Sequence, residues 1–192
     1  GSEMCIRDSK YSNVNNCKNE YINIRRHWEQ LVNKLQINTP MESTNILLNG
    51  WLIYQTISSR MYGKTGFYQS GGAYGFRDQL QDCMLIKYVE PNIAREQILR
   101  NCRHQFIEGD VEHWWHEETD KGIRTRISDD LLWLPYVVAD YISFTGDYEI
   151  LEENPSYKDG LRLSENENER YDLYKDADFK ESVYKHLSLI HI

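Results

Sequence analysis

Apolar residues recur at spacings of three and four along several stretches of this chain, which is the period of an amphipathic helix. Polar segments that contain glycine or proline separate these stretches. We find no convincing alternation of apolar and polar residues of the kind that marks a half-buried strand. The pattern therefore predicts an all-α fold, with helices over 21–35, 40–60, 77–87, 91–103, 128–145 and 178–186.

Two of these helices have recognisable ends in the sequence. At the start of the second, Thr39 can cap the helix, Pro40 suits the first helical position and Glu42 can close a capping box. The helix over 128–145 begins with Ser128-Asp129-Asp130, where an N-cap and two carboxylates suit the positive end of the helix dipole. Gly146 supplies its stop.

Three intervals lack the helical period and are predicted to be loops. They are the glycine-rich segment 63–75, the segment 109–126, and the polar stretch 152–168. Long loops on one side of a helical scaffold are where binding and catalytic residues are usually found. We therefore look for function in and beside these segments.

Composition and charge exclude some classes of protein. With 192 residues, of which 40% are hydrophobic, the chain is long enough for one domain with a sizeable core. Its net charge of −8 argues against a nucleic-acid partner, because phosphate backbones require a concentrated positive surface. No apolar run approaches the roughly 20 residues of a membrane-spanning helix, so we expect no membrane segment.

The four cysteines favour a reducing environment. Cys5, Cys17, Cys83 and Cys102 show no C-x-x-C spacing and have no histidines at metal-ligand offsets. Cys83 and Cys102 lie in helical patterns, where a buried free thiol is the usual state. We therefore expect a cytoplasmic protein without disulfides, without a bound metal and without an organic cofactor.

Both ends of the chain differ in character from the rest. Residues 1–9 show no periodicity, and 187–192 form an abrupt apolar tail, so we expect both to be non-native tails. Residues 10–38 are then an N-terminal lead-in, and 39–186 form the main domain. We expect this domain to be part of a longer protein.

The first candidate site lies in residues 71–82, where turn glycines precede an arginine, carboxylates and amides. Asp78, Gln81 and Asp82 share one face of the predicted helix, because they are three and four residues apart. Carboxylates and amides bind sugar hydroxyls, and the glycines allow the backbone to approach a ligand closely. The alternative is a solvated helix face that begins with an aspartate.

The second candidate site is Glu108–His116, which contains Asp110, His113, Trp114 and Trp115. Two adjacent tryptophans cannot easily face one core, so one of them can line a cleft and cover the C–H face of a sugar ring. The alternative is a core aromatic pair with surface charge beside it. The two histidines at three-residue spacing lack a third metal ligand, and we give no role to His104 beyond the end of a helix.

A third group contains Arg124, Arg126, Asp129 and Asp130, which form a charged rim in this interpretation. An arginine there can hold an anion such as phosphate. The alternative is that the arginines simply pair with the aspartates.

The motifs Gly71–Asp82, Gly109–His116 and Ser128–Tyr136, in this order and spacing, resemble glycoside hydrolase family 94. This family contains cellobiose, chitobiose and other disaccharide phosphorylases and the cyclic β-1,2-glucan synthases. The resemblance covers about Leu35 to His186. The lead-in Phe67-Tyr68-Gln69-Ser70 is similar to the branch of cyclic β-1,2-glucan synthases and 1,2-β-oligoglucan phosphorylases.

The resemblance implies a partial (α/α)6 barrel and an inverting mechanism on β-glucosidic linkages, by phosphorolysis or transglycosylation. One acidic side chain protonates the glycosidic oxygen while inorganic phosphate, the co-substrate, attacks from the opposite face. Phosphate carries its own charge, so no second carboxylate base is needed. The implied partners are a β-linked glucan or disaccharide and phosphate.

Site residues follow from the resemblance by position. Asp78 resembles a residue that binds donor-sugar hydroxyls, and Lys64 lies where relatives place an arginine near phosphate. Gly72 stands where some disaccharide phosphorylases have another arginine, which favours the β-1,2-glucan branch. The predicted substrate-binding residues are Arg77, Asp78, Gln81, Asp82, Asp110, His113, Trp114 and Trp115, and the predicted phosphate-binding residues are Lys64 and Arg124.

One expected motif is missing. The family's general acid lies in a Gly-Asp-Trp-Asn-Asp-Gly-like motif that follows the helix predicted over 178–186, and the 192 residues contain no such motif. A complete barrel also needs twelve helices, and about six are predicted. One alternative is a non-catalytic carbohydrate-binding helical domain with Trp114 and Trp115 as stacking platforms, and another is a helical interaction module without affinity for glycans.

Because the motif of the general acid is absent, we expect this 192-residue chain alone to be catalytically inactive. The measurement is release of sugar 1-phosphate from a β-1,2-glucan in the presence of inorganic phosphate. Phosphate-dependent release by the purified chain would contradict this expectation.

Overall fold

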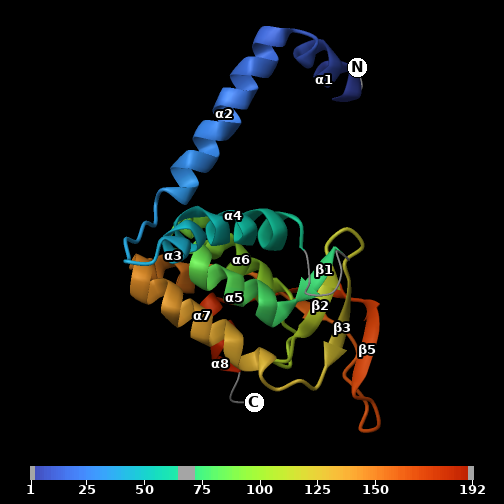
Figure 1. Ribbon diagram of the computed structural model, residues 1–192. Coiled ribbons are helices and arrows are strands. Elements are labelled where there is room, and N and C mark those ends of the chain that lie inside the picture. The colour runs from blue at the N-terminus through green and yellow to red at the C-terminus, as the bar shows by residue number, and fades with distance from the viewer. Residues whose placement is uncertain (1–2, 65–71, 190–192) are drawn as a thin grey trace. The chain divides into compact units, whose positions relative to one another are not determined.

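The computed structural model describes residues 3–64 and 72–189 of the chain. The chain forms two compact units that divide between Tyr54 and Gln55. Figure 1 shows their elements. The described part of the first unit is helical, and the second unit combines helices with two small sheets.

The first unit begins with α1 (Glu3–Tyr11) and α2 (Val14–Val32). Asn13 caps α2, because its side chain accepts a hydrogen bond from the Asn15 backbone N–H at 2.9 Å. The helix predicted from Tyr21 is confirmed. It begins earlier, at Val14, because this asparagine supplies the cap.

The next part of the chain consists of four consecutive helical segments. It consists of α3 (Glu42–Ile46), the π-helical η1 (Leu47–Trp51), α4 (Leu52–Gln55) and the π-helical η2 (Thr56–Tyr62). This confirms the helix predicted over 40–60. The predicted capping box is wrong, because Met41 occupies the N-cap without a side-chain bond and the Thr39 hydroxyl donates to Asn45 Oδ1 instead.

Three helices form the helical layer of the second unit, namely α5 (Phe76–Ile86), α6 (Pro91–Arg103) and α7 (Asp130–Thr145), and each contacts the other two. All three confirm predicted helices. Gly146 ends α7 with a φ of 72°, a left-handed conformation that glycine adopts without strain. The 3-10 turn η3 (Tyr148–Glu152) and the short helix α8 (Val183–Ser188) complete the helices described in this unit.

The predicted fold class is wrong, because the second unit contains strands as well as helices. The strands β1 (Ala73–Gly75), β2 (Glu112–His116), β3 (Lys121–Thr125) and β5 (Glu169–Leu173) form one antiparallel sheet in that order. A second sheet pairs β4 (Ser156–Asp159) with β6 (Lys175–Lys180). The described part of the molecule is therefore a mixture of helices and strands. It is not all-α and does not consist of helical hairpins alone.

The strands lie largely in segments that we predicted to be loops, or in the case of β6 partly in a predicted helix. They are three to six residues long, and several of their positions are charged. A β-bulge between Glu112 and Trp114 further breaks the alternation along β2. Short, charged and bulged strands carry little period-2 signal, which explains the error.

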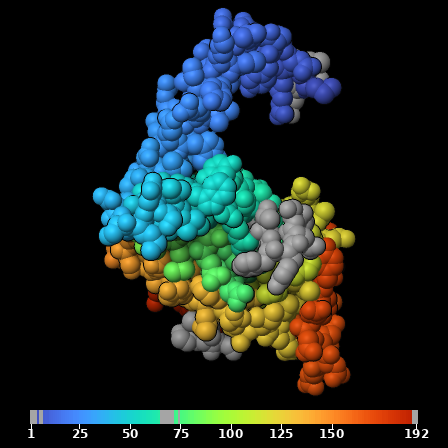
Figure 2. Space-filling view, in the orientation of Figure 1, coloured from blue at the N-terminus to red at the C-terminus, as the bar shows by residue number. Residues whose placement is uncertain are grey.

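The core of the second unit lies where the helical layer meets the sheets. Its fully buried apolar side chains include Ile57, Phe76, Leu80, Ile86, Ile98, Phe106, Ile150 and Val183. Each such side chain stabilises the fold by about 1.5–3 kcal/mol relative to exposure. In Figure 2 the orange residues of β5 form one rim of this unit, next to the yellow residues of β3.

Two expectations about environment are addressed by the structure. Cys83 and Cys102 are free and buried, as predicted from their helical pattern. None of the helices in the described ranges has both the length and the apolar character needed to cross a lipid bilayer.

Candidate functional site

Strand β2 positions most of the predicted site residues. It lies between β1 and β3, with Trp114 opposite Gly75 and Ile123, and Trp115 opposite Gly122. Neighbouring residues of a strand point to opposite faces of the sheet. The two tryptophans are therefore separated by the strand itself.

Trp115 belongs to the core. Only 2% of its surface is exposed, and its indole stacks on the His104 ring with 3.7 Å between centroids and 13° between planes. Phe76 meets it edge-on at 6.5 Å. Trp114 is half-buried on the other face, where it lies beside Tyr171 and His116.

Beneath Trp115, His104 and Glu112 form a buried pair through His104 Nδ1 and Glu112 Oε2. Gly122 makes room for this carboxyl, because a Cβ there would lie 2.0 Å from Glu112 Oε1. Burial raises the pKa of Glu112 to about 8 and lowers the pKa of His104 well below its usual value. Burial therefore disfavours the charged form of both side chains.

Asp78 lies in the first turn of α5, close to β2. A Cβ on Gly75 would lie 2.6 Å from Asp78 Oδ2 and 3.3 Å from the His113 carbonyl oxygen, so these groups surround one point. Arg60 faces both acidic residues of α5, with its Nε 3.1 Å from Asp82 Oδ2 and its Nη2 3.7 Å from Asp78 Oδ1. Burial raises the pKa of Asp82 to about 6.

The start of α7 contributes a second set of charges to this cluster. His113 Nδ1 lies 2.6 Å from Oδ2 of Asp130, which is 1% exposed. The hydrogen bond to Asp130 raises the pKa of His113. Arg77 Nη1 donates to Asp129 Oδ2 at 3.2 Å. We call Arg60, Arg77, Asp78, Asp82, His113, Asp129 and Asp130 the donor cluster.

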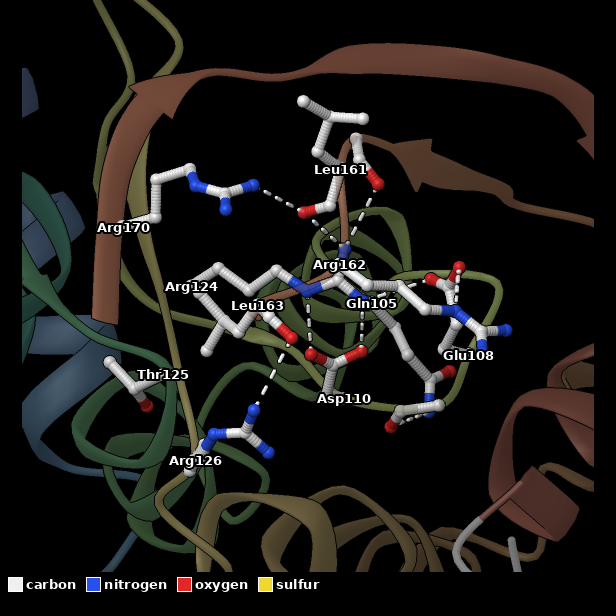
Figure 3. A network of polar contacts seen from close by, with 12 residues as sticks. Gln105, Glu108, Asp110, Arg124, Thr125, Arg126, Leu161, Arg162, Leu163 and Arg170 are labelled. Carbon is white, nitrogen blue, oxygen red and sulfur yellow. Dashed lines mark hydrogen bonds and ion pairs between the residues drawn. The ribbon is translucent and has the colours of Figure 1, made fainter. Parts of the chain in front are cut away.

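Asp110 and Arg124 belong to a different network, which Figure 3 shows. The guanidinium of Arg124 is almost fully buried and lies over the Phe106 ring at 3.9 Å. Its Nε and Nη2 donate to the two carboxylate oxygens of Asp110, each at 2.6 Å, and Nη2 also donates to Glu108 at 2.9 Å. This is the bidentate geometry of a strong, charge-assisted pair.

The remaining donors of Arg124 are also engaged. Its Nη1 donates to the backbone carbonyls of Gly160 and Leu161 at 3.1 and 3.2 Å. A guanidinium has five N–H groups, so all of them have partners here. A phosphate at Arg124 would have to displace a carboxylate or a carbonyl.

The Arg124 network borders a cavity of about 370 Å³. Its lining comprises Glu108, Gly109, Asp110, Arg124, Thr125, Arg126, Ile127, Ser128, Leu131, Arg162, Leu163 and Leu189. Asp78 is not part of this lining. Of the predicted substrate residues, the structure thus places Arg77, Asp78, Asp82 and His113 together, whereas Asp110 lies in a separate network.

Two further predicted residues lie outside both groups. Gln81 is exposed on α5. Lys64 pairs with Glu117, whose other carboxylate oxygen lies 3.0 Å from Arg100 Nη1. Two cations therefore hold one carboxylate just beyond the end of β2.

Arg60, Arg100, His104 and Glu117 were not predicted, and Glu112 lies in the second candidate segment without a predicted role of its own. Arg60 and Arg100 lie in helices whose role seemed structural, and His104 was expected only to end a helix, which it does as the C-cap of α6. Their partners are 8 to 22 residues away in the sequence. The strand pairing that brings His104 and Glu112 together had no signal in the sequence.

Carboxylates, a histidine and arginines beside an aromatic strand are side chains that can hydrogen-bond to sugar hydroxyls. The particular family follows from comparison with known proteins. The chain belongs to the glycosyl hydrolase 94 superfamily, whose catalytic-domain model matches residues 27–188. The resemblance inferred from the three motifs is thus confirmed.

The relatives include a synthase and phosphorylases. The chain is 41% identical over 159 residues to the cyclic beta-(1,2)-glucan synthase NdvB of Rhizobium meliloti (strain 1021), which is 83% of this chain and 6% of that protein. It is 24% identical over 180 residues to the N,N'-diacetylchitobiose phosphorylase of Vibrio furnissii, covering 79% of this chain and 22% of that protein. With the solabiose phosphorylase of Paenibacillus borealis it shares 31% identity over 126 residues, covering 65% and 15%. The chain therefore spans less than a quarter of each relative's length.

The buried Glu112 predicts a pH-dependent stability. Its pKa in the folded state is raised from 4.5 to about 8, so its burial costs nothing below about pH 4.5. The cost grows as pH rises from about 4.5 to about 8 and stays constant above that. In a Glu112→Gln variant the amide replaces the protonated carboxyl at all pH values. Between pH 5 and pH 9 we expect the variant to gain about 2–4 kcal/mol in free energy of unfolding relative to the parent.

Chemical denaturation across this pH range is the measurement. Glu96→Gln, on an exposed carboxylate of α6, is the matched control, and its difference from the parent should change little with pH. A constant difference between the Glu112→Gln variant and the parent would show that Glu112 is ionised in the fold.

The Asp130–His113 pair predicts a shift in the titration of the histidine. Asp130→Asn removes the charge that stabilises the imidazolium, so the titration of His113 should move to lower pH. The His113 ring resonances in NMR spectra report this directly. Asp129→Asn is the control, because the neighbouring Asp129 pairs with Arg77, and an equal shift in both variants would contradict the assignment.

Proposed function

We propose that this chain is part of the catalytic domain of a glycoside phosphorylase or glucan synthase that acts on β-glucosidic linkages with inversion. The chain contributes walls of the donor-sugar site, and the general acid comes from outside these residues. Membership of the family supports the reaction class. The identity shared with a cyclic beta-(1,2)-glucan synthase supports a β-1,2-linked substrate.

The observation that carries the proposal is the state of three of the four carboxylates in the donor cluster. Asp130 is buried and engaged with His113 at 2.6 Å, and Asp82 is bound by Arg60 at 3.1 Å. Asp78 keeps 31% of its side chain exposed, and its Arg60 contact of 3.7 Å is too long for a hydrogen bond. Asp78 therefore retains the acceptor capacity that a sugar hydroxyl requires.

We further propose that phosphate binds through Lys64 and Arg100 rather than through Arg124. The five donors of Arg124 are all engaged. Lys64 and Arg100 instead share the carboxylate of Glu117, which is an exposed side chain on a turn. An anion can displace such a group at lower cost than it can displace two buried carboxylate bonds.

The second candidate function is carbohydrate binding without catalysis. The half-buried Trp114 beside the exposed Tyr171 favours it, because such rings are available for stacking. Trp115 cannot serve in this way without unpacking the core, since it is stacked on His104. Phosphorolysis by a longer protein that includes this chain would distinguish the two functions.

The proposed donor site predicts that Asp78→Asn weakens sugar binding. A hydrogen bond to a charged group contributes roughly 1.5–3 kcal/mol, so affinity for a β-1,2-linked glucose disaccharide should fall about 10- to 100-fold. Isothermal titration calorimetry on the 192-residue chain measures this. The control is Asp159→Asn, on an exposed carboxylate of β4.

The control variant should bind the disaccharide as the parent does. Equal affinity of the parent and the Asp78→Asn variant would remove Asp78 from the site. Absence of any binding by the folded parent would leave the donor site without support in this chain.

A further inference from the structure

The register of the four-stranded sheet creates a row of residues that leads away from the donor cluster. Gly75 on β1, Trp114 on β2, Ile123 on β3 and Tyr171 on β5 lie opposite one another across the sheet. Residues paired in this way share one face. The row begins at the residue before α5 and ends at the edge strand β5, as the strand order in Figure 1 shows.

Two residues of this row carry aromatic rings, Trp114 on β2 and Tyr171 on the edge strand β5. The Trp114 and Tyr171 rings are 5.4 Å apart between centroids and tilted by 38°, and His116 meets Trp114 edge-on at 5.5 Å. Tyr171 is 49% exposed. An aromatic pair that is open on one side offers an apolar face with a polar edge, as sugar-binding surfaces do. We call Trp114 and Tyr171 the aromatic platform.

A cavity of about 340 Å³ lies beside the platform. Its lining comprises Gly72, His116, Glu118, Thr119, Lys121 and Tyr171. The volume is at the lower end of the range for small-molecule sites. The lining combines one carboxylate, one ammonium group, a threonine hydroxyl and a phenol, so it offers both donors and acceptors at close quarters.

The charges of this cavity favour a neutral ligand with many hydroxyl groups. Glu118 and Lys121 contribute one charge of each sign, and both are exposed. Neither makes an ion pair with a side chain in the described ranges of the chain. An anion or a cation would be repelled by one of the two, whereas sugar hydroxyls can bond to both.

The lining of the cavity contains no residue of the donor cluster, and its Tyr171 side lies at the far edge of the sheet. Tyr171 lies three strands from Gly75, which corresponds to about 14 Å at the usual spacing of strands. A ligand bound at Asp78 would therefore have to be a chain of several units to reach Tyr171. Because of this distance, a sugar unit bound at Tyr171 would occupy a subsite of its own and not a part of the donor site.

We propose that the aromatic platform and its cavity form a second saccharide subsite, which holds a pyranose unit of a β-linked glucan chain remote from the reacting bond. One ring of the chain stacks on Tyr171 and Trp114. Its hydroxyls bond to Glu118, Thr119 and Lys121. The inference rests on the proposed function, since it requires that the substrate be a glucan chain.

The test compares short and long ligands. Isothermal titration calorimetry measures the affinity of the parent and the Tyr171→Ala variant for a β-1,2-linked glucose disaccharide and for a hexasaccharide. Loss of the Tyr171 ring from the aromatic platform should weaken hexasaccharide binding about tenfold. Disaccharide binding should remain unchanged. Tyr148→Ala is the matched control, because Tyr148 is a more exposed tyrosine on η3, away from this face.

The outcomes separate this inference from the proposed function. If Asp78→Asn weakens both ligands but Tyr171→Ala weakens neither, the second subsite is wrong and the donor site stands. If Tyr171→Ala weakens the hexasaccharide but Asp78→Asn has no effect on either ligand, the donor assignment fails and the subsite stands. A parent that binds no hexasaccharide, or that forms a dimer through this face in sedimentation experiments, overturns the subsite.

A second variant guards against loss of structure. Lys121→Ala changes an exposed side chain on the hairpin and should also weaken the hexasaccharide selectively. Thermal unfolding of each variant identifies any loss of fold. If the Lys121→Ala and Tyr171→Ala variants both fold and both bind the hexasaccharide as tightly as the parent, the inference is contradicted.

Discussion

Strand β2 can bury only one of its two adjacent tryptophans, and much of the second unit follows from which one it buries. Trp115 enters the core, where it stacks on His104 and meets Phe76. Because neighbouring side chains alternate, Trp114 must then lie on the opposite face. The same choice directs the His113 side chain toward the start of α7, where its ring contacts the buried carboxylate of Asp130.

The register of β2 is fixed by shape and by polarity. A shift by one residue would bring Trp114 inside and expose Trp115. The absence of a side chain at Gly122 leaves a slot for the Glu112 carboxyl, and His104 supplies that carboxyl with a partner. A buried carboxyl without a partner costs far more than the strand pairs gain. The bulge after Glu112 allows this slot to be filled while the following residues keep their pairing with β3.

The sequence predicted the helices well and the sheets not at all. The pattern over Pro91–Arg103 and the stop at Gly146 depend on local chemistry, and the structure has both. The strands depend on pairing with distant residues, as with β5, which pairs with β3 across more than 40 residues. For the site, local spacing on α5 grouped Asp78 with Asp82, but no local rule indicates that Asp130 binds His113. Motif resemblance pointed to these segments, and only the fold could sort their residues into two networks.

That sorting follows from the cost of burying charge. Arg124 is buried, so each of its N–H groups needs an acceptor, and Asp110, Glu108 and two carbonyls are consumed in meeting this need. Such a network holds the 108–110 turn, β3 and the segment after β4 together, as Figure 3 shows, and leaves no N–H group of Arg124 for a ligand. Ligand binding requires the opposite condition, which is a polar group that is positioned but not saturated. Asp78 meets this condition within the donor cluster, because its nearest guanidinium is already bound by Asp82.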